Sequence, residues 1–208
     1  MNRKFVCMYI ITVLAVICLC GCARYQAEMS YTIDAPDVVT ASLEIPKAIV
    51  VYDSWSGNTK LIAEAMAKEM KCPAVQVKNV SEFNMADYDL IVIGSPVHGG
   101  MPTGEVDQFL TDLETPRASA VFVTFGAPLF GPFTANRCLN SMAEKLHETC
   151  IGRFKCHGFH HLFRTYSDHP DEIDKTDAEK FAAGLLERCR KLTQPEAGSA
   201  QPVNNETE

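Results

Sequence analysis

The most informative stretch of the chain is residues 48–60, which read AIVVYDSWSGNTK. Residues 48–52 form an apolar run that predicts a buried β-strand, and apolar side chains recur at helical spacing after Lys60. The loop between them, residues 53–59, is rich in hydroxyl groups and has no basic residue. The free N–H groups of a helix's first turn and the positive end of its dipole attract an anion. We therefore predict that this loop binds a phosphate group.

The order of residues in the loop restricts which phosphate can bind. A triphosphate loop reads G-x-x-x-x-G-K-[ST] and a dinucleotide loop reads G-x-G-x-x-G, whereas Gly57 is the only glycine here. A single terminal phosphate remains, with an ordinary polar strand-to-helix turn as the alternative. Gly57 allows the backbone to approach a ligand closely, and Ser54, Ser56 and Thr59 can donate hydroxyl hydrogen bonds.

Residues 54–59, SWSGNT, resemble the FMN phosphate loop of the flavodoxin family, [ST]-x-[ST]-G-N-T, at every position. Residues 94–102 and 124–131 resemble the two loops that hold the flavin ring in that family, and the similarity extends over about residues 47–192. The resemblance implies FMN as the cofactor. It also implies a set of cofactor-binding residues, which are Ser54, Trp55, Ser56, Gly57, Asn58, Thr59, Pro96, Val97, His98, Gly99, Gly100, Gly126, Phe130 and Gly131.

The pair Gly99-Gly100 has a more specific role by analogy with flavodoxins. In that family a glycine peptide turns over to offer its carbonyl to the reduced flavin, and glycine makes such a rotation sterically cheap. The alternative is that the two glycines only form a tight turn.

Five apolar runs predict strands, and most are separated by stretches with helical periodicity. The strands are expected at Ala48–Tyr52, Ala74–Val77, Leu90–Ile93, Ala120–Phe125 and Ile151–Phe159. The last helix is expected to begin at a capping box formed by Thr176 and Glu179. Strands that alternate with helices imply parallel pairing in an α/β fold. The resemblance implies a three-layer, flavodoxin-like, doubly wound, five-stranded parallel sheet in the order 2-1-3-4-5.

The N-terminus has the features of an export signal. Arg3 and Lys4 precede a largely apolar run that ends in Leu19-Cys20-Gly21-Cys22. These four residues resemble the lipoprotein box of bacteria, which implies lipidation of Cys22. An uncleaved membrane anchor is the alternative. We therefore expect a signal peptide at residues 1–21, a tether at 22–46, a single domain at 47–192 and a disordered tail at 193–208.

The net charge of −7 argues against nucleic acid as a partner, because such a surface repels phosphates. Five of the nine cysteines lie within the expected domain, and Cys72 with Cys189 is a candidate disulfide, the alternative being free thiols. A metal site built from Cys156, His157, His160 and His161 is disfavoured, because the spacing matches no common zinc pattern and neighbours on a strand point to opposite faces. We predict no metal.

These observations lead to one functional hypothesis and two alternatives. The hypothesis is an FMN-binding electron-transfer protein, lipid-anchored on the extracytoplasmic side of a bacterial cell envelope. Its partner would be a redox protein or a small electron acceptor. The first alternative is an FMN-dependent oxidoreductase that acts on a quinone or a porphyrinogen-like substrate. The second is a flavin-free binding module with the same fold. No catalytic residues are legible.

Overall fold

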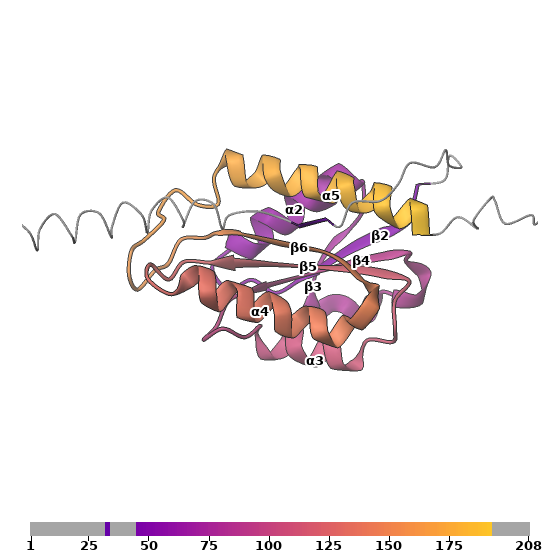
Figure 1. Ribbon diagram of the computed structural model, residues 1–208, viewed down its shortest axis with the longest axis horizontal. Helices are drawn as coiled ribbons and strands as arrows, with labels where there is room; N and C mark the ends of the chain where they lie inside the picture. Colours follow the sequence, from indigo (N-terminus) through magenta and orange to yellow (C-terminus); the bar gives the residue numbers. More distant parts are fainter. Residues whose placement is uncertain (1–31, 34–44, 193–208) are drawn as a thin grey trace, which may run out of the picture.

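The computed structural model describes residues 32–33 and 45–192, in which a sheet lies between two layers of helices (Figure 1). The predicted signal peptide, Cys22, most of the tether and the tail lie outside the described residues. The strands are β1 (Thr32–Ile33), β2 (Ala48–Tyr52), β3 (Ala74–Gln76), β4 (Leu90–Pro96), β5 (Ala118–Phe125) and β6 (Cys150–His157). The α-helices are α2 (Asn58–Met70), α3 (Gly104–Asp112), α4 (Gly131–Leu146) and α5 (Glu172–Leu192). Short 3₁₀ helices are η1 (Val77–Glu82), η2 (Met85–Asp87) and η3 (His147–Thr149).

The sheet confirms the predicted fold class. Its strand order is β1-β6-β5-β4-β2-β3, and β2 to β6 pair in parallel. Numbered among themselves, the five parallel strands have the order 2-1-3-4-5. The sixth strand, β1, pairs antiparallel with β6, with Thr32 opposite Arg153 and Ile33 opposite Gly152. The sequence did not predict this strand, because two residues are too few to produce a period.

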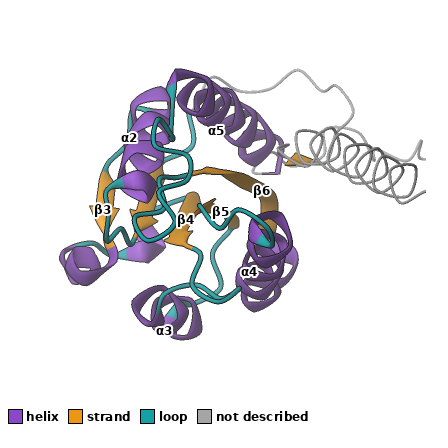
Figure 2. Cartoon of the chain, turned by 90° about the vertical axis from the view of Figure 1, so that its left-hand side faces the viewer, coloured by secondary structure: helices purple, strands orange, loops and turns teal. Residues whose placement is uncertain are grey.

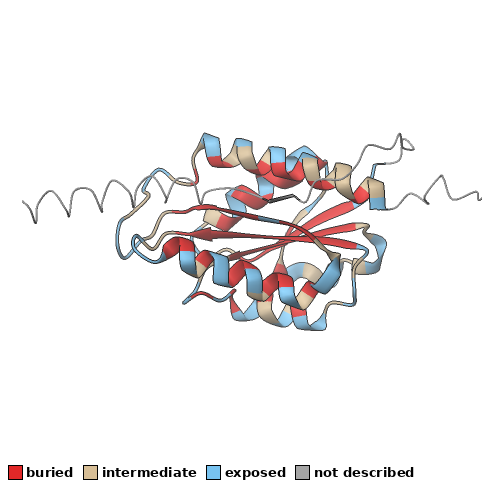
Figure 3. Ribbon diagram, viewed as in Figure 1, coloured by how far each residue is buried: buried red, intermediate tan, exposed pale blue. Residues whose placement is uncertain are grey.

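Each face of the sheet has its own apolar core. Helices α2 and α5 cover one face, whereas α3 and α4 cover the other (Figure 1), and the strands between them are buried almost throughout (Figure 3). Phe122 and Phe181 belong to the first core, and Val121 and Met142 to the second. Burial on both faces explains why β2 and β5 read as continuous apolar runs instead of alternating ones.

Two helices begin earlier than the sequence predicts. Helix α4 starts at Gly131, with Pro132 in its first turn, within a segment that the sequence placed in the second ring loop. Proline is well suited to that position because the N–H it lacks has no helical partner there. Helix α5 starts at Glu172, so the expected capping box at Thr176 is wrong. The hydroxyl of Thr176 donates instead to the Glu172 carbonyl at 2.8 Å.

The start of α5 is fixed by a carboxylate version of the same capping pattern. Asp171 Oδ1 accepts the N–H groups of Ile173 and Asp174 at 2.8 and 2.9 Å, and Asp174 Oδ2 accepts the N–H of Asp171 at 3.0 Å. The first N–H groups of the helix are thus satisfied one turn before the expected position. No helix in the described part of the chain is long and apolar enough to span a bilayer.

Candidate functional site

The loops that follow β2, β4, β5 and β6 meet at the carboxyl ends of the strands, the end of the molecule that faces the viewer in Figure 2. They enclose a crevice of about 420 Å³, which is within the range of about 300–1,000 Å³ common for small-molecule sites. It lies where the strand order reverses, the place where open α/β sheets bind ligands. Its lining is Trp55, Ser56, Asn58, Pro96, Val97, His98, Thr124, Phe125, Gly126, Gly158, Phe159, His160, His161 and Leu162.

The predicted phosphate loop wraps around the N-terminus of α2. Gly57, the residue before the helix, has φ of 91°, a left-handed conformation that a side chain would strain. Its carbonyl accepts the N–H of Leu61 at 3.0 Å, and Ser54 Oγ accepts the N–H of Lys60 at 3.2 Å. Within the described residues, the N–H groups of Asn58 and Thr59 have no acceptor. This end of α2 therefore offers unsatisfied donors to an anion.

Two buried hydroxyl groups lie below the loop. Thr59 and Thr124, which are 1% and 3% exposed, share a hydrogen bond of 2.9 Å between their Oγ1 atoms. The pair joins the first turn of α2 to the end of β5. Because each hydroxyl has both a donor and an acceptor capacity, Thr59 can turn its proton toward a ligand while it still accepts from Thr124.

Asp53 sets the orientation of the only tryptophan in the chain. Its carboxylate is buried and accepts the N–H of Ser54 at 2.8 Å and the indole Nε1–H of Trp55 at 3.0 Å. The Trp55 ring then contacts His98, with ring centroids 4.2 Å apart. These two rings, from the loops after β2 and β4, form one side of the crevice mouth.

Asn58 joins the phosphate loop to the loop after β6. Its Nδ2 donates to the Phe159 carbonyl at 3.0 Å. A Cβ on Gly158 would lie 2.8 Å from that Nδ2, so the contact requires glycine at residue 158. Gly126 has a similar role, because a Cβ there would lie 2.5 Å from the Gly158 carbonyl. Thr165 Oγ1 also donates to the Gly126 carbonyl at 2.7 Å, so the last two loops are held together.

Residues 98–101 form a tight turn beside the crevice. His98 and Met101 exchange two backbone hydrogen bonds of 2.9 Å, and Gly99 and Gly100 have φ of 57° and 86°. Positive φ at both central residues is the signature of a type I′ hairpin turn. The glycines therefore do form the tight turn that the sequence left as an alternative.

The structure separates the predicted cofactor-binding residues into two groups. Trp55, Ser56, Asn58, Pro96, Val97, His98 and Gly126 line the crevice, whereas Ser54, Gly57, Thr59, Gly99, Gly100, Phe130 and Gly131 do not. Ser54, Gly57 and Thr59 still shape the N-terminus of α2. Phe130 is 71% exposed, and Gly131 packs against Phe125, whose ring a Cβ would approach to 2.8 Å.

Comparison with known proteins identifies the family. A family model described as the flavodoxin domain matches residues 49–161, just over half of the chain. The chain belongs to the flavodoxin family. An uncharacterised protein of Methanocaldococcus jannaschii is 28% identical over 148 residues, which cover 67% of this chain and 98% of that protein.

Solved flavodoxins have the same fold as this domain. An archaeal flavodoxin matches with a TM-score of 0.54 at 20% identity, covering 69% of this chain and 98% of its own. A Fusobacterium nucleatum flavodoxin bound to flavin mononucleotide matches with a TM-score of 0.52 at 10% identity, covering 69% of this chain and 99% of its own.

Sequence reasoning missed part of the crevice of this flavodoxin domain. Thr124 and Phe125 end β5; they belong to the segment at residues 124–131 that resembles a flavin-ring loop, but they were not among the predicted cofactor-binding residues. Residues 158–162 were not among the predicted cofactor-binding residues, and the structure places His160 and His161 in the crevice wall. The disulfide candidate is not present, since all five cysteines among the described residues are free thiols. Burial raises the pKa of Cys72 and of Cys189 to about 11.

A histidine cluster that the sequence did not predict lies behind the loop after β6. His157 is buried and stacks on Tyr166 with centroids 4.0 Å apart, and His169 meets the His157 ring edge-on at 5.4 Å. Burial, followed by the positive charges of His169 and Lys155, lowers the pKa of His157 from 6.5 to about 4. His157 is therefore a neutral packing residue at neutral pH.

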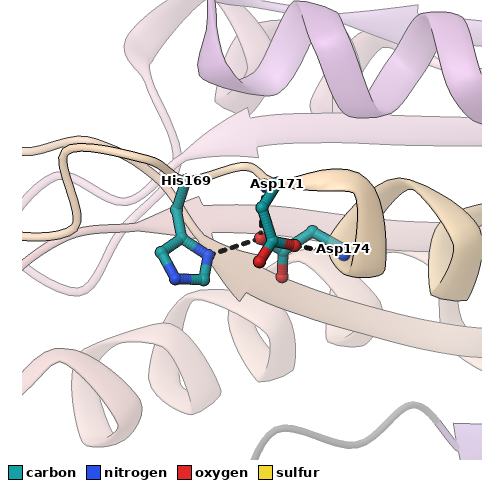
Figure 4. A group of neighbouring side chains, drawn as sticks. All are labelled: His169, Asp171 and Asp174. Atoms are coloured by element: carbon teal, nitrogen blue, oxygen red, sulfur yellow. Dashed lines mark hydrogen bonds and ion pairs between the residues drawn. The ribbon is translucent and has the colours of Figure 1, made fainter.

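His169 is also bound to the cap of α5. Its Nδ1 lies 2.6 Å from Asp174 Oδ2, and together with Asp171 these side chains converge (Figure 4). Burial raises the pKa of Asp174, although its hydrogen bond to His169 acts in the opposite direction. Among the described residues these three are the only group of potential metal ligands that lie together, and Cys156, His157, His160 and His161 do not form one. Because both carboxylates cap the helix, the group has a structural explanation.

Proposed function

We propose that this flavodoxin domain binds FMN in the crevice and acts as an electron-transfer protein. The observation that carries the proposal is the N-terminus of α2. There a loop of neutral donors, held by the left-handed Gly57, presents the free N–H groups of Asn58 and Thr59 at the edge of a crevice of suitable size. This donor set fits a phosphate group without a basic side chain. The match to the flavodoxin family supports FMN as the ligand that carries the phosphate.

The residues in the crevice and at its edge would perform separate tasks. The first turn of α2, with Thr59, would hold the phosphate. Trp55 and His98 supply aromatic surface for a flat ring at the mouth. FMN, when bound, would supply the electron-transfer chemistry. The side chains of Asp53 and Asn58 do not need to touch it, since they position Trp55 and the loop after β6 through hydrogen bonds.

The turn at residues 98–101 can present two different groups to a ligand. Both primed turn types fit a two-residue hairpin, and they differ by rotation of the central peptide. The peptide between Gly99 and Gly100 can thus turn over while His98 and Met101 keep their two hydrogen bonds. One orientation would offer the Gly99 carbonyl and the other the Gly100 N–H. We propose that this rotation adjusts the hydrogen bonding of the site to the redox state of the ligand.

We also propose that the mature protein is lipid-anchored at Cys22 on the extracytoplasmic face of a bacterial membrane. The support is the sequence alone: a short basic segment, an apolar run and the Leu19-Cys20-Gly21-Cys22 box. Two or more acyl chains would make such an attachment stable.

A visible absorption spectrum of the purified protein tests the cofactor, and titration with FMN and riboflavin tests the phosphate site. The proposal predicts a yellow protein that binds FMN at least about tenfold more tightly than riboflavin, the difference expected for one charge-assisted hydrogen bond or more. A protein that stays colourless after FMN is added would instead support a flavin-free binding module.

A second candidate, an FMN-dependent oxidoreductase, is favoured by one observation. His160 and His161 line the crevice in addition to the flavin loops, so ionisable side chains lie where a small substrate would meet the cofactor. Stopped-flow reduction separates the two functions. A carrier accumulates its one-electron-reduced form, whereas rapid two-electron turnover of a quinone without that form would favour the enzyme.

A further inference from the structure

We propose that the rim of the crevice docks on the surface of the membrane to which the protein is anchored, so that the crevice opens toward the bilayer. The proposal rests on the anchor at Cys22 proposed above and goes beyond it, because an anchor alone does not decide which face of the domain meets the lipid.

The first observation is the uneven distribution of exposed apolar side chains. Among the described residues, eleven large hydrophobic side chains are exposed, and seven of them lie on the crevice loops or in the first turn of α4. We call these seven residues the rim: Trp55, Met101, Leu129, Phe130, Phe133, Leu162 and Phe163. Single exposed apolar residues need no explanation, but a group that surrounds one opening marks an interaction site.

The second observation concerns Leu162 and Phe163, which we call the tip of the rim. Leu162 and Phe163 are 80% and 56% exposed at the end of a turn whose base is closed by pairing of His160 with Thr165. Thr165 in turn holds the loop after β5 through Gly126. That neighbouring loop presents Leu129 and Phe130, so the two most exposed large hydrophobic side chains among the described residues, Leu129 and Leu162, project from two connected loops.

The third observation is charge. The chain has 26 acidic and 19 basic residues, yet loop residues 54–59, 97–103 and 126–133 contain no Asp or Glu, whereas the loop after β6 contains Asp168 and Asp171. The exposed cations Arg137 and Arg164 lie near the rim. An anionic lipid surface attracts Lys and Arg and repels carboxylates, so the three loops without Asp or Glu are the part of the rim that can approach it.

The fourth observation is the position of β1. Strand β1 pairs antiparallel with β6, and β6 runs toward the crevice. Followed backward from Ile33 to Thr32, the chain therefore also runs toward the crevice. Thr32 follows Cys22 by only ten positions in the sequence, a span of at most about 36 Å when fully extended. Arg153 is four residues, or about 13 Å, from the end of β6. A lipid on Cys22 would thus lie a short chain length from β1, the edge strand of the sheet, on the side toward the rim.

Fluorescence of the full-length protein in vesicles tests this arrangement. Trp55 is the only tryptophan of the chain and belongs to the rim, so it reports on the face in question. The protein would be reconstituted, without added FMN, into vesicles of phosphatidylethanolamine and phosphatidylglycerol with either plain or brominated acyl chains. Brominated chains quench a tryptophan that reaches the acyl boundary. We expect Trp55 emission to be about twofold or more lower in the brominated vesicles, since an interfacial apolar face lies about 5–10 Å deep.

Two double variants with similar side-chain exposure test whether the crevice end or the opposite end of the domain contacts the membrane. Leu162→Asn with Phe163→Asn changes the tip, whereas Ile45→Asn with Leu192→Asn changes two residues, 71% and 57% exposed, at the opposite end. The first variant should lose the quenching and the second should keep it, while far-UV circular dichroism confirms that both are folded. Equal emission of the wild type in the two kinds of vesicle would overturn the proposal and leave the rim to a protein partner. Equal loss in both variants would overturn it too.

Two further measurements separate this proposal from the proposed function. Mass spectrometry of the N-terminal peptide tests the lipid on Cys22, and an FMN titration tests the cofactor. If Trp55 is quenched but Cys22 carries no lipid, or FMN does not bind, the docking is supported and the lipid anchor or the FMN-binding function, respectively, is refuted. A yellow, acylated protein without quenching keeps the function and overturns the docking.

Discussion

The buried hydroxyl pair of Thr59 and Thr124 allows the phosphate site to be tested by a double-mutant cycle. Valine has nearly the shape of threonine without the hydroxyl. Thr59→Val would leave the Thr124 hydroxyl, 3% exposed, without its partner at 2.9 Å. An unpaired buried hydroxyl costs about 1–3 kcal/mol of stability. When Thr124→Val is added, both hydroxyls are absent. The double variant should therefore be more stable than the sum of the single effects predicts, by about 1 kcal/mol.

Ligand affinity gives the functional half of the same experiment. If Thr59 donates to the phosphate, Thr59→Val and the double variant should bind FMN about 10- to 100-fold more weakly, which corresponds to a charge-assisted hydrogen bond of about 1.5–3 kcal/mol. Riboflavin lacks the phosphate, so its affinity should stay unchanged. Urea unfolding followed by circular dichroism measures stability, and quenching of flavin fluorescence measures affinity. Equal losses for FMN and riboflavin would refute the role of Thr59, and purely additive stabilities would refute the hydroxyl contact.

Three further predictions concern Gly158, Gly57 and His157. Gly158→Ala should displace Asn58 from the Phe159 carbonyl, destabilise the domain by about 1–3 kcal/mol and weaken FMN binding, because the new Cβ would lie 2.8 Å from Asn58 Nδ2. The control Gly104→Ala, which meets nothing within 4 Å, should be neutral or stabilising in thermal unfolding. Gly57→Ala should cost about 1–2 kcal/mol in the same measurement because of its φ of 91°, and an unchanged melting temperature would contradict this. The pKa of His157 is about 4 in the folded state and 6.5 in the unfolded state. Between these pH values the unfolded chain therefore binds one more proton than the folded protein. The free energy of unfolding should fall by up to about 3 kcal/mol as the pH drops from 6.5 to 4. His157→Phe should remove this component in pH-dependent urea unfolding, whereas the exposed His161→Phe should not; equal pH profiles for all three proteins would count against a neutral buried His157.

The parts of the fold that were predictable are those in which burial leaves a pattern. The five parallel strands lie between helices on both faces, so each reads as an apolar run, and the loop at residues 54–59 has a distinctive order of residue types. The strand β1 could not be found, because it pairs through two residues whose side chains give no period. The start of α5 was misplaced because its cap uses Asp171 and Asp174, whereas the Thr176 and Glu179 pair fits the usual pattern and lies inside the helix.

The site was predictable only where it is local in sequence. Trp55, Ser56 and Asn58 belong to one motif, and the crevice contains them. The contacts that shape the site join distant residues, such as Asn58 with Phe159 and Thr59 with Thr124. A hydrogen bond between residues 101 positions apart leaves no local signal. Gly158 is an example: the sequence gives no local reason for a glycine there, and the structure explains it by the close approach of Asn58.

The most direct test of the account is a crystal structure of the protein with FMN added. We predict that the phosphate oxygens accept hydrogen bonds of about 3 Å from the N–H groups of Asn58 and Thr59 at the start of α2, with the ring beside Trp55 and His98. An empty crevice, or a phosphate bound away from this helix terminus, would contradict the central claim.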